Sequence, residues 1–126
     1  MNPQDFLQTA QNLSVSQYEA DMRSAISRAY YAALHTAFNA LPEQRRPDLK
    51  ARDKSSHSKV IDAYDGWSKT IEPKRTDKRL IKEMLIDIKS QRTRADYELD
   101  AAINKDDVSD SLEQAKAVIA MASALS

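Results

Sequence analysis

Residues 17–41 read QYEADMRSAISRAYYAALHTAFNAL, and this stretch decides the fold. Its apolar side chains recur at spacings of three and four residues, which places them on one face of an α-helix. They are Tyr18, Met22, Ala25, Ile26, Ala29, Ala33, Ala37 and Leu41. Ser16 is a candidate N-cap with Glu19 three residues later, as in a capping box, and Pro42 cannot continue the helix. We therefore expect one long helix with a single buried face over 17–41.

Three later stretches show the same helical spacing: one begins at residue 55 or 56, one spans 76–99, and one begins at residue 108 or 109. Their expected inward residues are Val60, Ile61, Tyr64, Trp67, Leu80, Ile81, Met84, Leu85, Ile88, Ala95, Leu99, Leu112, Ala115, Ile119, Ala122 and Leu125. A short apolar segment, 5–13, precedes the long helix. Because each helix has one apolar face and no strand-like alternation is present, we expect an all-α, antiparallel four-helix bundle with an additional short N-terminal helix.

Composition excludes several classes of protein. At 126 residues the chain fits a single domain, 1–126, that is large enough to fold without disulfides or a structural metal ion. It has no cysteine, so disulfide frameworks and thiolate metal sites are excluded, and its single glycine excludes a glycine-rich phosphate loop. No apolar run approaches the roughly 18 residues of a membrane span, and the first residues lack the layout of a signal peptide. We therefore expect a cytoplasmic protein without a membrane segment.

The net charge of zero hides an uneven distribution. Residues 42–94 hold 15 Lys and Arg against 9 Asp and Glu, a net charge of +6 that the rest of the chain balances. Within this region the connection 42–55 carries Arg45, Arg46, Lys50, Arg52 and Lys54, and we expect it to be a mobile basic segment. Two interpretations stay open: the basic region attracts RNA or an acidic partner, or it is a solvated charged surface.

Arg28 and His35 are the first candidates for chemistry. They lie seven residues apart in the long helix, so their side chains leave it within roughly 20° of each other, with Cα atoms roughly 10 Å apart. An arginine that holds a phosphate and a histidine that moves a proton are the minimum needed to cut RNA without a metal ion.

The face that carries this pair also carries aromatic residues, which an exposed helix face usually lacks. Its other members are Asp21, Ser24, Tyr31, Leu34 and Phe38. Aromatic residues with arginine are enriched at protein interfaces, so we infer a homodimer in which two copies of the Arg28/Tyr31/His35 face meet about a two-fold axis. In the alternative interpretation the aromatic rings pack against neighbouring loops, and Arg28 pairs with Asp21 or Asp96.

Arg92 is the second unusual residue. It follows Ile88 by four residues on the apolar stripe of its helix, and a charge at or beside a buried face needs a partner. Asp96, one turn later, is the local candidate, and Asp21 and Glu19 on the long helix are others. Either Arg92 and Asp96 orient the Arg28/His35 site, or they form an ion pair that fixes the register of the bundle.

His57 lies at the start of a helix, between Ser56 and Ser58, where free backbone amides favour anions. It is either a second proton-transfer residue or an exposed histidine with no role in chemistry. Two histidines without cysteine, and without a paired metal-binding motif, predict no metal site. We expect no cofactor.

Three motifs together resemble the small HEPN-domain proteins: Ser-Arg-Ala-Tyr-Tyr-Ala-Ala-Leu-His at 27–35, Ser-His-Ser at 56–58 and Arg-x-x-Ala-Asp-Tyr at 92–97. The resemblance covers roughly 15–120. It implies an antiparallel helical bundle that dimerises, often a toxin or defence protein beside a nucleotidyltransferase-type or other antitoxin partner. Catalytic members of that family carry an Arg-x(4–6)-His motif at the dimer cleft and cut RNA without metal. Arg28 and His35 match its longest spacing, although Ala29 stands where many active members have a polar residue.

Two functions therefore stay open. In the first, the chain is an RNA-associated, metal-independent endoribonuclease that leaves 2′,3′-cyclic phosphate ends: His35 moves the proton and Arg28 stabilises the charge on phosphorus. The supporting or RNA-contacting residues would be Tyr31, Ser24, Arg92 and Asp96. In the second, the chain is a non-catalytic, dimeric helical module that binds a partner protein or RNA through the same face.

Overall fold

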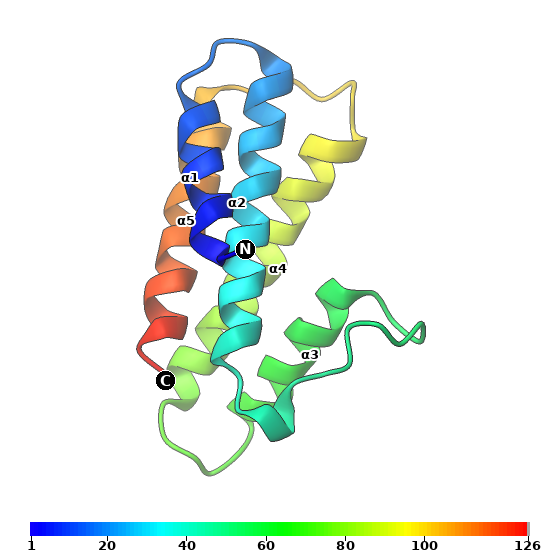
Figure 1. Cartoon of the computed structure of the whole chain (residues 1–126), viewed down its shortest axis with the longest axis vertical. Helices are drawn as coiled ribbons and strands as arrows, with labels where there is room; N and C mark the ends of the chain where they lie inside the picture. The colour runs from blue at the N-terminus through cyan, green and yellow to red at the C-terminus, as the bar shows by residue number, and fades with distance from the viewer. Residues whose placement is uncertain (126) are drawn as a thin grey trace.

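The computed structural model describes residues 1–125 and contains five α-helices, with no strand in that range (Figure 1). The helices are α1 (Pro3–Ser14), α2 (Glu19–Ala40), α3 (Ser56–Ser68), α4 (Arg75–Tyr97) and α5 (Lys105–Ser123), and a short 3₁₀ turn, Glu43–Arg45, follows α2. The expectation of an all-α chain is confirmed. None of these helices is both long and apolar enough to cross a membrane.

Helix α2 is the centre of the arrangement. It packs against α1, α4 and α5 along its length, whereas α3 packs mainly against α4 near the end where α2 finishes (Figure 1). Its alanines Ala29, Ala33 and Ala37 are fully buried, and such small side chains let neighbouring helices approach closely. Helix α1 packs alongside one face of α2 and is part of the bundle (Figure 1).

Two helix starts differ from the sequence-based expectation. Tyr18, not Ser16, occupies the N-cap position of α2, and the Ser16 hydroxyl instead donates to the Asp21 carboxylate at 2.6 Å. Helix α5 begins earlier than residue 108, because Asn104 and Asp107 form a reciprocal capping box. Both residues precede the start at residue 108 or 109 that the sequence pattern predicts.

Tyr18 and Leu80, which are expected on buried faces, are 76% and 38% exposed. The expected burial of Leu99 is also wrong, since that residue is 75% exposed. Helix α4 ends at Tyr97, two residues before it. The Arg23 guanidinium from α2 donates to backbone carbonyls at this end, among them those of Ala95 at 2.8 Å and Ala101 at 2.5 Å. Arg23 therefore closes the end of α4 and turns the chain away before Leu99 can reach the core.

Candidate functional site

The Arg28 and His35 side chains lie on the face of α2 that packs against α1. Phe6 of α1 contacts both: the Arg28 guanidinium lies 5.9 Å from the Phe6 ring centre, and the His35 ring stacks on it at 5.5 Å and 9°. Arg28 pairs with neither expected carboxylate, because Asp21 accepts from Ser16 and Asp96 pairs with Arg92. Within one chain, the pair is thus linked through Phe6.

His35 lines an open hollow of about 410 Å³ between the start of α1, the second half of α2 and the connection that follows it. The lining residues are Met1, Pro3, Phe6, His35, Phe38, Asn39 and Leu49. The His35 ring is half-buried and contacts the Phe6 and Tyr31 rings, but within 1–125 it makes no hydrogen bond or ion pair. Its ring nitrogens therefore have no hydrogen-bond partner among the described residues.

A second group of side chains surrounds Arg92, and we call it the Arg92 centre: Tyr30, Tyr31, His57, Arg92, Asp96 and Tyr97. Arg92 Nε lies 2.9 Å from the Asp96 carboxylate, and an Arg92 Nη donates to the Tyr31 hydroxyl at 3.2 Å. Ser27 on α2 also donates to Asp96, at 3.2 Å. The expected local pair is present within α4, and its bonds to Tyr31 and Ser27 join α4 to α2.

Three aromatic rings enclose the Arg92 guanidinium. Its central carbon lies 5.3 to 5.9 Å from the ring centres of Tyr30, Tyr31 and Tyr97, and only 12% of its side chain is exposed. Such a cation gains from the ring faces as well as from its carboxylate partner. Arg92 is therefore held by Asp96 and these rings, although its buried Nε makes no hydrogen bond.

His57 completes this centre from the first turn of α3. Its Nδ1 shares a hydrogen bond of 2.5 Å with the Tyr30 hydroxyl, and its ring is half-buried. Burial lowers the pKa of His57, and the positive charges of Arg92 and Lys89 lower it further. Burial also raises the pKa of the Tyr30 hydroxyl, so that both groups are neutral near pH 7.

The structure thus brings together the three motifs, on α2, α3 and α4. Tyr31 links the two groups, since its ring lies 6.3 Å from His35, 6.1 Å from His57 and within 5.6 Å of the Arg92 guanidinium. Ser24 is exposed on α2 and belongs to neither group. Sequence reasoning missed Tyr30 and undervalued His57, for which the Ser-His-Ser stretch at the start of a helix was the available signal.

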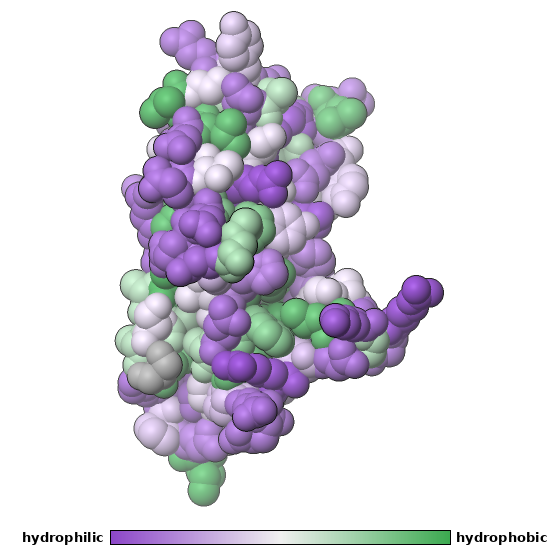
Figure 2. Space-filling model, in the orientation of Figure 1, coloured by the Kyte–Doolittle hydropathy of each residue, from purple (hydrophilic) through white to green (hydrophobic). Residues whose placement is uncertain are grey.

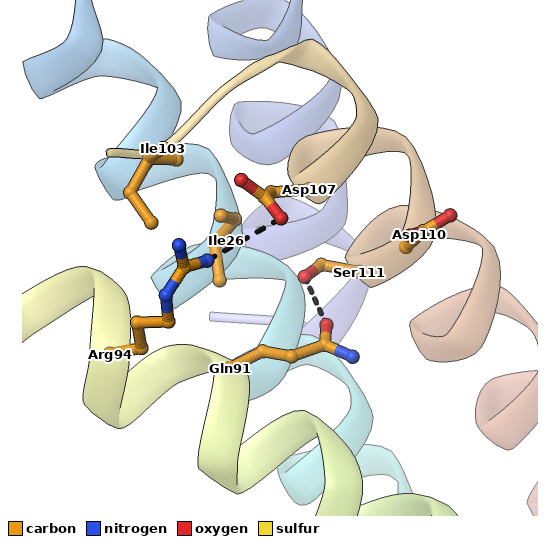
Figure 3. A pocket seen from close by; sticks show the side chains of 7 residues that line it. All are labelled: Ile26, Gln91, Arg94, Ile103, Asp107, Asp110 and Ser111. Atoms are coloured by element: carbon orange, nitrogen blue, oxygen red, sulfur yellow. Dashed lines mark hydrogen bonds and ion pairs between the residues drawn. The ribbon is translucent and has the colours of Figure 1, made fainter. Parts of the chain in front are cut away.

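A smaller cavity, of about 80 Å³, lies between α2, α4 and α5 (Figure 3). Its polar side chains bind one another: Arg94 pairs with Asp107 at 3.4 Å, and Gln91 accepts from the Ser111 hydroxyl. Gln91 also donates to Gln114, at 2.7 Å. These contacts tie α4 to α5 and leave Asp110, which is exposed, as the lining side chain without a polar partner in the described chain.

Among residues 1–125, no three His, Asp or Glu side chains lie close enough together to hold a metal ion. Comparison of the chain with protein-family models, curated proteins and solved structures gave no match. Function is therefore inferred from the two groups of side chains themselves.

Proposed function

We propose that this chain is a HEPN-like, RNA-associated protein that acts as a metal-independent endoribonuclease, with Arg28 and His35 as its catalytic residues. The observation that carries the proposal is the state of these two side chains. His35 faces an open hollow without a hydrogen bond, and Arg28 is exposed without an ion pair anywhere in the described chain. Both are positioned by a rigid helix and remain free to bind RNA.

The reaction is a transesterification within the RNA strand. His35 takes the proton of a ribose 2′-hydroxyl while the 2′-oxygen forms a bond to phosphorus and the bond to the 5′-oxygen breaks. Arg28 stabilises the negative charge that builds on the phosphoryl oxygens. A protonated imidazole gives its proton to the 5′-oxygen, which leaves one 2′,3′-cyclic phosphate end and one 5′-hydroxyl end. DNA lacks the 2′-hydroxyl and is not cut.

The reaction uses one base and one acid, whereas a single chain supplies one free histidine. A homodimer through the Arg28/Tyr31/His35 face would provide the second imidazole, His35 of the partner subunit, as the acid. The same assembly would place two arginines around the phosphate. We further propose a toxin or defence role in the cytoplasm, restrained by a nucleotidyltransferase-type or other antitoxin partner.

One observation favours a second function, a non-catalytic dimeric module that binds a partner protein or RNA. Phe6 contacts both Arg28 and His35 and covers part of the helix face between them. The Phe6 ring in this place suits a surface that binds a partner and catalyses no reaction. The two functions differ in whether the protein cleaves RNA and needs His35 to do so.

The test is an RNA-cleavage assay in EDTA with wild type, His35→Ala and Arg28→Ala, each checked for helicity by circular dichroism. Lys116→Ala, an exposed lysine on α5, is the matched control for loss of a surface cation. We expect wild type and the control to produce 2′,3′-cyclic phosphate ends and both site variants to lose at least about 100-fold in rate. No cleavage by wild type, tested free of partner, would contradict the enzymatic function and favour the module.

A further inference from the structure

The hollow beside His35 has a composition that suits a flat aromatic ligand. Phe38 and Asn39 come from α2, and Leu49 comes from the connection before α3. The Arg46 guanidinium lies 5.8 Å from the Phe38 ring centre and donates to the backbone carbonyls of Asn39, at 2.7 Å, and Leu41, at 2.9 Å. The aromatic wall is therefore held in place, while the Asn39 side chain is exposed at its edge.

The basic connection is fixed next to this hollow by a buried lysine. Lys59 of α3 is only 7% exposed; it donates to the Asp48 carbonyl at 2.7 Å and to the Ala51 carbonyl, and pairs with Asp53 at 3.1 Å. The Asp48 carboxylate accepts from the Lys50 backbone amide at 2.9 Å. These bonds tie the segment to α3, and Figure 2 shows it projecting from the bundle as a hydrophilic arm.

Two cations on this arm have no partner in the described chain: the exposed side chains of Lys50 and Arg52. Lys50 directly follows Leu49, which lines the hollow. Arg28, about two helical turns before His35 on α2, is likewise exposed and unpaired. Free positive charges thus occur on both segments that line the hollow, α2 and the basic connection, as in proteins that bind single strands through stacked bases and a basic path for the backbone.

We propose that this hollow binds one unpaired nucleobase of single-stranded RNA, which stacks on Phe38 and hydrogen-bonds to the Asn39 amide. The flanking phosphates lie on Arg28 on one side and on Lys50 and Arg52 on the other. The proposal rests on the proposed function and adds the class of substrate: in a duplex every base is stacked inside, so only a single-stranded segment supplies a free base. An acidic protein would use the cations but would leave the aromatic wall unexplained.

The test measures binding apart from cleavage, with a short 2′-O-methyl RNA that carries the fluorescent base 2-aminopurine and has no 2′-hydroxyl to react. We expect wild type to quench the fluorescence of one position as its base stacks. Phe38→Ala should weaken binding by about 5- to 150-fold, which is the value of one stacked base. Asn39→Ala, an exposed change that leaves the fold intact, should weaken it less and alter the preference among bases.

The arm is tested by the salt dependence of binding. Replacing both Lys50 and Arg52 by Ala should lower the slope of log affinity against log salt by about 1.4, or about 0.7 for each lost phosphate contact. The matched control, Arg75→Ala with Arg79→Ala, removes two exposed cations near the start of α4 and should leave the slope unchanged.

The outcomes separate this proposal from the proposed function, because cleavage of unmodified RNA by the same wild-type sample is measured in parallel. Cleavage by wild type with unchanged binding in the Phe38→Ala, Asn39→Ala and arm variants would overturn the base site and leave the enzyme standing. Binding that weakens in these variants, without any cleavage, would keep the base site and overturn the enzyme. Equal affinity for a blunt-ended RNA duplex, which has no unpaired base, would overturn the single-strand assignment.

Discussion

The chain has two histidines and places them in opposite situations. His57 is half-buried, shares a hydrogen bond with Tyr30 and lies beside Arg92, which is itself paired with a carboxylate. His35 faces a hollow without a hydrogen bond in the described chain, on the same face of α2 as the exposed Arg28. The two histidine–arginine pairs have the same chemistry, and only their partners differ. His57 and Arg92 make contacts that stabilise the fold, whereas His35 and Arg28 remain available to a ligand.

Replacing each arginine by Met should show the largest difference between the two pairs. Arg92→Met leaves the Asp96 carboxylate without its cation and breaks a contact between α4 and α2. We expect it to lower the free energy of unfolding by about 2–3 kcal/mol, less than for a fully buried pair because Asp96 is 26% exposed. Arg28→Met should change it by less than about 0.5 kcal/mol. Urea denaturation measures both, and equal losses would contradict a structural role confined to Arg92.

The bond between His57 and Tyr30 should give a smaller effect, which a double-mutant cycle isolates. Tyr30→Phe and His57→Asn each remove one side of the bond, and we expect a coupling free energy of about 1 kcal/mol. The same cycle between Tyr30→Phe and His35→Asn serves as the control, and it should give a coupling near zero. A coupling near zero in the first cycle would show that His57 is not held by Tyr30.

The smallest expected effect is a dependence of stability on pH. Because the native pKa of His57 is lowered, the unfolded chain takes up a proton on this ring first, near its ordinary pKa of about 6.5. The contribution of the neutral His57 ring to the free energy of unfolding is complete above a pH of about 6.5. It is lost as the pH falls from about 6.5 through the native pKa. His57→Asn should flatten this part of the curve measured by thermal unfolding. A steeper curve in the variant would mean that the ring is stabilised in its charged form.

This pH window is separate from acid unfolding. The Asp65 carboxylate accepts hydrogen bonds from Lys69 and Lys82, and these hold its pKa below the ordinary value. Its contribution is therefore lost only as the pH falls below about 4. The contribution of His57 is measured well above that point.

Most of the fold could be predicted from the sequence because helical spacing is a local signal. The ranges expected for α2 and α4 agree with the structure within about two residues at each end. The errors lie where a single side chain decides a boundary. Asn104 starts α5 through a capping box with Asp107, and Arg23 closes α4 by reaching its carbonyls from another helix. The first signal was present in the sequence, whereas the second depends on a contact between distant segments.

The candidate site could be predicted only in part. Spacing alone placed Arg28 and His35 on one face, and it placed Arg92 beside Asp96. It gave no sign that Phe6, from the first helix, contacts both members of the first pair. Nor did it show that His57 meets Tyr30, since those residues lie on different helices and only packing brings them together.

The central claim is that His35 is available for chemistry and that His57 is not. The most direct measurement compares RNA cleavage by His35→Ala and His57→Asn in EDTA at pH 7, each well below its unfolding transition. We predict that His35→Ala gives no cyclic-phosphate ends above background, while His57→Asn stays within about 10-fold of the wild-type rate. Loss of cleavage in His57→Asn together with a wild-type rate in His35→Ala would contradict the claim and move the reaction to the Arg92 centre.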